Sequence, residues 1–209
     1  MSSLFSKLFH FVILTSSKYN IDESHGLKHS MEVVQFAQKI FESELPKHVI
    51  LGTQERIVYT AAIIHDMCDK KYTNERKALR EIGEFLEPEL SEHEVSIVKE
   101  IISTMSYSKV KVNGFPQLGD YQKAYHVVRE ADLLAAYDFD RCMIYHMQTS
   151  DSDINSAFDN AAELFEKRVL KHNEHGLFTT EYAKEVSPVL HEQAIQRIGE
   201  WRKILYKLV

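Results

Sequence analysis

Residues 57 to 64 form an almost wholly apolar octet, Ile-Val-Tyr-Thr-Ala-Ala-Ile-Ile, which is followed at once by His65 and Asp66. A helix that is apolar on all sides is stable only when other elements surround it. We therefore expect a central helix here, starting after Thr53 as its N-cap. The polar pair at its end would then also be buried, where an imidazole and a carboxylate need a partner.

The rest of the chain is helical in period and poor in turn-forming residues. Seven glycines and four prolines occur among 209 residues, too few for the many turns of a β-sandwich. The Ser91-Glu92-His93-Glu94 segment is a capping box that marks one helix start. Apolar spacing predicts helices over residues 3–18, 22–44, 54–64, 74–87, 91–105, 120–137, 140–149, 153–172 and 180–206.

Residues 106–119 interrupt this pattern with the turn-forming sequence Asn113-Gly114-Phe115-Pro116. We predict a loop large enough to belong to an active site, with one short candidate strand at residues 109–112. The chain has no internal repeat, low-complexity tract or long linker. The fold expected is all-α: one compact domain over residues 1–209, with about nine or ten helices.

The charge, the cysteine content and the apolar N-terminal run limit which partners and which cellular location are expected. The net charge of −6 provides no global field that attracts nucleic acid, so an anionic substrate would need local cations or a metal ion. Two cysteines, Cys68 and Cys142, do not make a disulfide framework, which indicates a reducing, cytoplasmic location. The apolar run at residues 8–14 is too short to span a membrane. We interpret it as an amphipathic helix on the core, and leave open whether it forms a homodimer interface.

Several metal-binding side chains occur where core residues are expected. His25 and His29 are four residues apart and share a face if both are helical. Asp132 lies within an apolar helical stretch, where aspartate is rarely buried alone. A buried salt bridge to Arg129 or Arg141 is the structural alternative for Asp132. A mixed shell for one divalent cation is the other interpretation, with the ligands His29, His65, Asp66 and Asp132.

The order His, His-Asp, Asp resembles the signature of the HD-domain superfamily of metal-dependent phosphohydrolases. The resemblance covers most of the chain, through the segments DESHGLKHSMEVV, AAIIHDMCDKKY, IISTMSYSK, VVREADLLAAYD and FEKRVLKHNEHGLFTTEYAKEV. It implies a helical domain that uses one metal ion to hydrolyse phosphate esters or nucleotides. Small stand-alone members include enzymes that split nucleoside triphosphates into a monophosphate and pyrophosphate. By motif position, the resemblance implies the same four ligands, His29, His65, Asp66 and Asp132.

Further roles follow if this resemblance holds. Asp69 is the candidate catalytic residue that orients or deprotonates the attacking water, and it shares a face with Asp66 if the helix continues. A solvated carboxylate paired with a neighbouring lysine is the alternative for Asp69. Lys71 would balance phosphate charge, and His25 would donate to a phosphate oxygen or protonate the leaving group. Arg141 is a further candidate for phosphate binding, with a surface ion pair as the alternative.

The expected cofactor is one divalent ion, with Mn, Mg, Fe, Co, Ni and Zn all open, and the expected partner is a small phosphorylated molecule, most simply a nucleotide. A di-iron oxygenase on the same scaffold is one alternative, because His93 and His126 lie between the His-Asp pair and the last aspartate. Thr104-Met105 stands where a histidine for a second metal is expected, which favours one ion. A catalytically silent nucleotide-binding module is the other alternative. Leu133-Leu134-Ala135 departs from the polar pattern of close relatives and leaves the substrate open.

Overall fold

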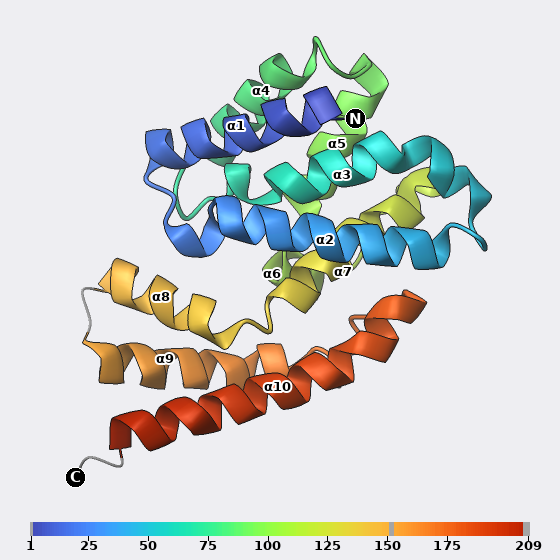
Figure 1. Ribbon diagram of the computed structural model, residues 1–209. Coiled ribbons are helices and arrows are strands. Elements are labelled where there is room, and N and C mark those ends of the chain that lie inside the picture. The colour runs from blue at the N-terminus through green and yellow to red at the C-terminus, as the bar shows by residue number, and fades with distance from the viewer. Residues whose placement is uncertain (1, 151–152, 207–209) are drawn as a thin grey trace.

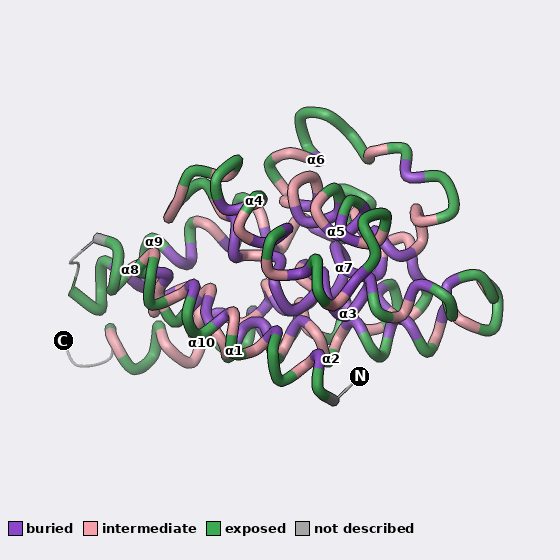
Figure 2. The backbone as a smooth tube through the Cα atoms, turned by 90° about the horizontal axis from the view of Figure 1, so that it is seen from above, coloured by how far each residue is buried: buried purple, intermediate pink, exposed green. Residues whose placement is uncertain are grey.

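The apolar octet lies in helix α3 (Glu55–Ile64) at the centre of the protein, and all eight of its residues are buried. The computed structural model describes residues 2–150 and 153–206. Helices α2 (Leu27–Glu44), α5 (Glu92–Thr104) and α7 (Gln122–Ala135) pack around α3, and α1 (Ser2–Tyr19) contacts it as well. Figure 2 shows the buried residues concentrated along α3 and α7.

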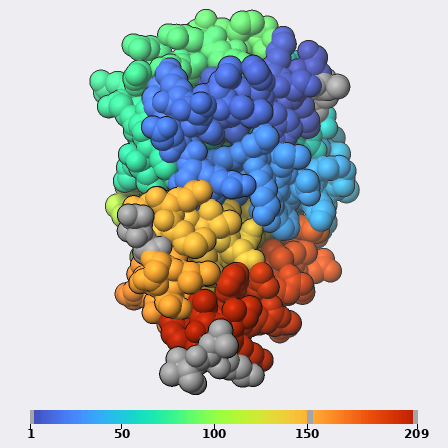
Figure 3. Space-filling view, turned by 60° about the vertical axis from the view of Figure 1, so that its left-hand side comes forward, coloured from blue at the N-terminus to red at the C-terminus, as the bar shows by residue number. Residues whose placement is uncertain are grey.

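The helices form a stack in which the last three helices lie together at one end. In Figure 1, α1, α4 (Glu75–Leu86) and α5 lie on one side of α2 and α7, and α8 (Phe139–Ser150), α9 (Ile154–Lys167) and α10 (Glu181–Tyr206) lie on the other. Figure 3 shows the same division, with the first half of the chain, blue and green, at one end and the C-terminal segments, orange and red, at the other. Residues 2–150 and 153–206 contain helices and no strand, which confirms the all-α fold. None of these helices is both long and apolar enough to cross a membrane.

The structure confirms two local predictions, the amphipathic first helix and the capping box at Ser91. Helix α1 buries Leu4, Leu8 and Val12, which are spaced four residues apart along one face. At the start of α5, the Ser91 side chain accepts a hydrogen bond from the Glu94 amide, and the Glu94 carboxylate accepts one from the Ser91 amide. The amphipathic helix and the capping box therefore form as the sequence indicates.

Two predicted helix starts are wrong. The segment from residue 22 is not one helix, because a 3-10 helix (Glu23–His25) ends at Gly26, whose backbone is extended, and α2 starts after it. His25 and His29 consequently do not share an α-helical face. Thr53 is not the N-cap of α3, because it lies in a second 3-10 helix (Val49–Gln54) and its hydroxyl donates to the Ile50 carbonyl.

Two other segments differ from the prediction in a way that matters for the site. Residues 107–113 form helix α6 (Tyr107–Asn113) in place of the predicted loop and strand. The alternating sequence there is misleading, since Val110 is buried while Val112 is 82% exposed. The helix predicted over 153–172 is broken at Arg168, where φ is −132° and ψ is −65°, between α9 and a 3-10 helix (Val169–Lys171).

A buried carboxylate in α7 attaches the C-terminal helices to the core. Glu130 accepts hydrogen bonds from the Arg129 guanidinium at 2.8 Å, from the Thr179 amide at 2.9 Å and from the Thr180 amide at 2.9 Å. Both threonine hydroxyls also donate to it. Glu44 of α2 accepts from the first amide of α10 at 2.8 Å. Carboxylates from α2 and α7 thus satisfy the N-terminal region of α10, where negative charge is favourable.

We predict that Glu130→Ala destabilises the protein by about 3–5 kcal/mol, because the buried Arg129 guanidinium loses its carboxylate partner and two threonine amides lose their acceptor. Urea unfolding followed by circular dichroism measures the loss. The control is Glu163→Ala, which removes an exposed ion pair with Lys167 and should leave the midpoint nearly unchanged. Equal midpoints for the two variants would contradict this account of how α10 is attached.

Candidate metal centre

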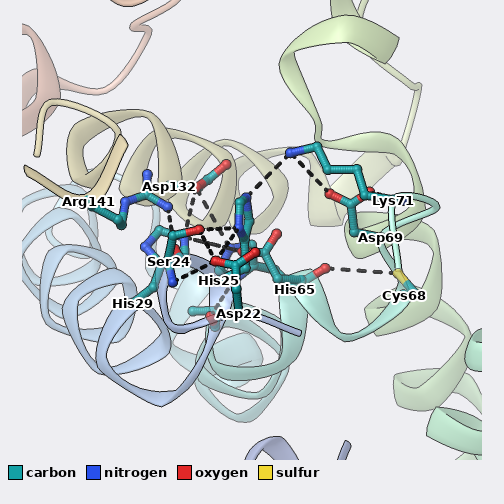
Figure 4. Close-up of polar contacts among 12 residues, drawn as sticks. Asp22, Ser24, His25, His29, His65, Cys68, Asp69, Lys71, Asp132 and Arg141 are labelled. Atoms are coloured by element: carbon teal, nitrogen blue, oxygen red, sulfur yellow. Dashed lines mark hydrogen bonds and ion pairs between the residues drawn. The ribbon is translucent and has the colours of Figure 1, made fainter. Parts of the chain in front are cut away.

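Four side chains from three helical segments converge at the end of α3 (Figure 4). His29 comes from the first turn of α2, and Asp132 comes from the third turn of α7. His65 and Asp66 open a 3-10 helix (His65–Cys68) that continues α3. Because α3 packs against both α2 and α7, the end of its apolar octet brings this pair between the other two side chains.

The donor atoms have the spacing of ligands to one ion. His29 Nε2 lies 3.2 Å from His65 Nε2 and 3.4 Å from Asp66 Oδ2, and His65 Nε2 lies 3.2 Å from the same oxygen. Asp132 Oδ1 lies 3.3 Å from His29 Nε2 and 3.7 Å from His65 Nε2. Ligands held at about 2.0–2.2 Å from one divalent ion are roughly 3–3.6 Å apart. The donors of His29, His65 and Asp66 therefore match the size of a metal site, and Asp132 lies beside both imidazoles. We call these four side chains the His-Asp cluster.

Hydrogen bonding orients the cluster for a cation. His65 Nδ1 lies 2.9 Å from the Ala62 carbonyl, which can only accept, so Nδ1 carries a hydrogen and Nε2, which has a lone pair when the ring is neutral, faces the cluster. Asp66 Oδ2 is buried and receives no hydrogen bond from the described residues. Two imidazole nitrogens and an unsatisfied carboxylate oxygen thus point at one another. This donor set fits a divalent metal ion, with nitrogen and oxygen ligands.

Burial and charge separate the pKa values of the two histidines. Burial, together with the charge of Arg141, lowers the pKa of His29 to about 4. Burial also disfavours charge on His65, but the negative charges of Asp66 and Asp132 outweigh it and raise the pKa of His65 to about 9. Burial raises the pKa of Asp66 and of Asp132, but the two neighbouring imidazoles lower it by more. Both pKa values therefore lie below the usual range of an aspartate. The metal-free cluster at neutral pH therefore holds one imidazolium between two carboxylates.

The cluster lies at a cavity of about 150 Å³. Its polar lining includes His25, Asp69, Lys71, Arg141 and Arg168, and its apolar lining includes Leu133, Leu164, Phe165 and Val169. Figure 4 shows Asp69 and Lys71 on one side of the cluster and Arg141 on the other. A larger, open groove lies between α4 and α5, and it contains none of the four cluster residues. The chemistry-bearing side chains therefore gather at the smaller cavity.

Asp69 reaches the cavity by a route that the sequence does not predict. Its backbone is extended, with φ −64° and ψ 126°, so it does not continue a helix face from Asp66. Its carboxylate accepts a hydrogen bond from the Lys71 amide at 2.9 Å and lies 3.8 Å from the Lys71 ammonium. The sharp turn after Cys68 places the acid and the lysine side by side at the cavity wall.

His25 is held by a group of residues that sequence reasoning missed. Its Nδ1 lies 2.7 Å from the Ser24 hydroxyl and 3.0 Å from the Tyr72 hydroxyl, and both hydroxyls donate to Asp22. Because the hydroxyl hydrogens are used by Asp22, the oxygens accept from His25 Nδ1–H. The other ring nitrogen, Nε2, lies 3.4 Å from the Lys71 ammonium, which can only donate. Asp22, at the predicted start of the second helix, was the one sequence feature that pointed to this group.

The structural alternatives for Asp132 are not realised among the described residues. Arg129 pairs with Glu130, and Arg141 donates to the Ser24 carbonyl at 2.9 Å. The histidines considered for a second metal also lie elsewhere. His93 contacts Tyr121 at 2.9 Å, and His126 contacts Gln122 at 3.2 Å, outside the cavity lining. Arg168 is a further charged residue of the cavity lining that the sequence analysis did not single out.

We predict that His65→Ala and Asp66→Ala each weaken Mn²⁺ binding by more than about 100-fold, because loss of an outer partner alone costs roughly 10–100-fold. Titration calorimetry measures the affinity. His93→Ala, which changes a histidine outside the cavity, is the matched control and should bind as the unmodified protein does. Wild-type affinity in either cluster variant would show that the ion binds elsewhere.

We also predict that metal binding releases about one proton per ion at pH 7. His65 is protonated there, because its pKa is raised to about 9, and it must lose that proton before Nε2 can bind a metal. His29, with a pKa of about 4, is already neutral. Affinity should rise about tenfold per pH unit between roughly pH 6 and 8. Calorimetry in buffers of different ionisation enthalpy counts the protons, and binding without proton release would refute the assignment.

Comparison with known proteins yields similarity of structure alone. No family model matches the chain, and no curated protein sequence matches it. A structural-genomics protein of Lactobacillus plantarum is 20% identical, with a TM-score of 0.69 over 96% of this chain and 98% of its own. YpgQ of Bacillus subtilis is 22% identical, with a TM-score of 0.53 over 86% of this chain and 97% of its own. At these identities the chain shares the all-α fold of both proteins.

Proposed function

We propose that this protein is a metal-dependent phosphohydrolase of the HD-domain type, acting on a small phosphorylated molecule, most simply a nucleotide. The observation that carries the proposal is the His-Asp cluster at a cavity that also holds Lys71 and Arg141. Cations gather at this point although the whole chain has a net charge of −6. A metal site next to positive side chains is suited to a phosphoryl group.

His29, His65, Asp66 and Asp132 would hold the metal ion. A divalent ion bound there would polarise a phosphoryl oxygen and lower the pKa of water, which is the chemistry that hydrolysis needs. Four protein side chains outside the cluster would supply the remaining functions.

Asp69 is the proposed base, because it lines the cavity beside Asp66 and has a lysine as its neighbour. It would orient the attacking water and accept its proton. Lys71 would offset the charge of the phosphoryl group, a role that its position 3.8 Å from Asp69 and over the Tyr145 ring at 5.1 Å allows. The pair thus provides one proton acceptor and one cation at the same wall.

His25 is the proposed proton carrier for the leaving group. Its Nδ1–H is held by the Ser24 and Tyr72 hydroxyls, so only Nε2 exchanges protons with the cavity. Arg141 would bind a phosphoryl oxygen from the side of the cavity opposite Lys71. Its guanidinium donates one hydrogen bond to the Ser24 carbonyl and has no acidic partner among the described residues, so other N–H groups are available. The hydrolase proposal therefore gives each predicted site residue a separate task.

Residue placement favours this proposal over a di-iron oxygenase. His93 and His126 lie outside the cavity, so they are not positioned to hold a second ion beside the His-Asp cluster. The apolar lining from Leu133 and Phe165 gives a substrate with an apolar or aromatic portion a surface to pack against. A nucleotide combines such a portion with phosphoryl groups.

The test is a panel of nucleotides and phosphate esters incubated with protein loaded with Mn²⁺, Mg²⁺, Co²⁺ or Ni²⁺. We expect metal-dependent release of phosphate or pyrophosphate. Asp69→Asn should lower kcat by about 10²–10⁴-fold because the proton acceptor is lost, while Mn²⁺ affinity stays unchanged. Asp120→Asn, at an exposed position outside the cavity, is the control. Absence of turnover on the whole panel, or full activity of Asp69→Asn, would count against the proposal.

A further inference from the structure

Arg168 lies where α9 stops and the chain changes direction. Its backbone leaves the helical region, with φ −132°, before the short 3-10 helix (Val169–Lys171) begins. Three of its neighbours in sequence, Leu164, Phe165 and Val169, line the cavity beside the His-Asp cluster, and so does Arg168 itself. The same arginine and Asp132 also line the adjoining hollow beneath α6. The break in α9 thus places a cation at the cavity wall next to Asp132.

The Arg168 guanidinium has no acidic partner among the described residues. Arg129 and Arg197, by comparison, form ion pairs with Glu130 and Asp140. The contact recorded for the Arg168 guanidinium is the ring of Tyr107, at 4.5 Å from its central carbon to the ring centroid. Burial lowers the pKa of Arg168, against the opposing charge of Asp132. A partly buried cation without hydrogen bonds is costly, which suggests that its partner is a ligand.

Tyr107 fixes the orientation of this cation. The tyrosine belongs to α6, and the central carbon of the guanidinium lies over its ring. A guanidinium carries five N–H donors, and no described residue accepts from those of Arg168, so they are available to a ligand. The edge of a guanidinium can bind two oxygens of one oxyanion at once. The Arg168–Tyr107 pair is therefore organised to bind an anionic group in the cavity.

We propose that Arg168 binds a phosphoryl group of the substrate, and that Tyr107 is a positioning residue that holds the guanidinium in place. The identity of the anion as phosphoryl rests on the proposed function. Arg168 directly follows α9, so this contact would join the C-terminal helices to a site otherwise built from α2, α3 and α7. It adds a third cation beside Lys71 and Arg141.

A structural role for Arg168 is the competing explanation. The residue follows the C-terminus of α9, where a positive charge is favourable. That role predicts a stability loss on substitution and no change in phosphate binding. The ligand role predicts the reverse.

Titration calorimetry of inorganic phosphate into the Mn²⁺-loaded protein separates the two. We expect Arg168→Gln to weaken phosphate binding at least about tenfold, and Arg168→Lys to fall in between because it keeps the charge but not the planar edge. Mn²⁺ affinity and the melting temperature should stay as in the unmodified protein. Arg202→Gln is the matched control, since Arg202 stacks on the Phe158 ring at 5.9 Å but is exposed and outside the cavity. Its phosphate affinity should not change.

Tyr107 variants test the positioning role. Tyr107→Leu removes the ring and should weaken phosphate binding, while Tyr107→Phe keeps the ring and should restore it. Phosphate affinity of Arg168→Gln within about twofold of the unmodified protein would overturn the inference. Failure of the two proposals can be told apart. If the unmodified protein hydrolyses a phosphoester and Arg168→Gln binds phosphate as well as it does, only the role of Arg168 is refuted. If Arg168→Gln binds phosphate more weakly but the unmodified protein turns over no substrate, only the hydrolase proposal is refuted.

Discussion

Two imidazole nitrogens, His29 Nε2 and His65 Nε2, lie 3.2 Å apart in the interior, and the carboxylates of Asp66 and Asp132 lie beside them. No arrangement of hydrogens satisfies such a set as well as one divalent ion does. The cluster exists only if α2, α3 and α7 meet at one point. The apolar octet of α3, enclosed by both other helices, is what makes them meet.

Two arginines without an acidic partner among the described residues line the cavity at this cluster. Arg129 is neutralised by Glu130, and that pair attaches α10. Arg141 and Arg168 line the cavity without an acidic partner among the described residues, and Lys71 lies beside Asp69. The Arg129 guanidinium thus has a carboxylate partner, whereas the two cavity arginines have none among the described residues. This contrast is the physical basis for assigning an anionic substrate to a chain of negative net charge.

Much of this arrangement follows from local sequence patterns, and the rest does not. The octet at residues 57–64 predicted the central helix, and the polar pair after it predicted where the cluster begins. Asp69 lines the cavity as expected, but through an extended backbone and not a helical face. Arg168 and Asp22 were missed, since their roles depend on a helix break and on side chains far away in sequence. The alternation of polar and apolar residues over 109–112 predicted a strand, but these residues belong to helix α6. Only Val110 of the helix is buried, so the apolar pattern was too short to show the helical period.

Anomalous X-ray diffraction from crystals of the Mn²⁺-loaded protein tests the central claim most directly. The account predicts one anomalous peak per chain, within coordination distance, about 2.0–2.3 Å, of His29 Nε2, His65 Nε2 and a carboxylate oxygen of Asp66 and of Asp132. A peak that misses any of these four side chains, or a second peak beside the first, would contradict it.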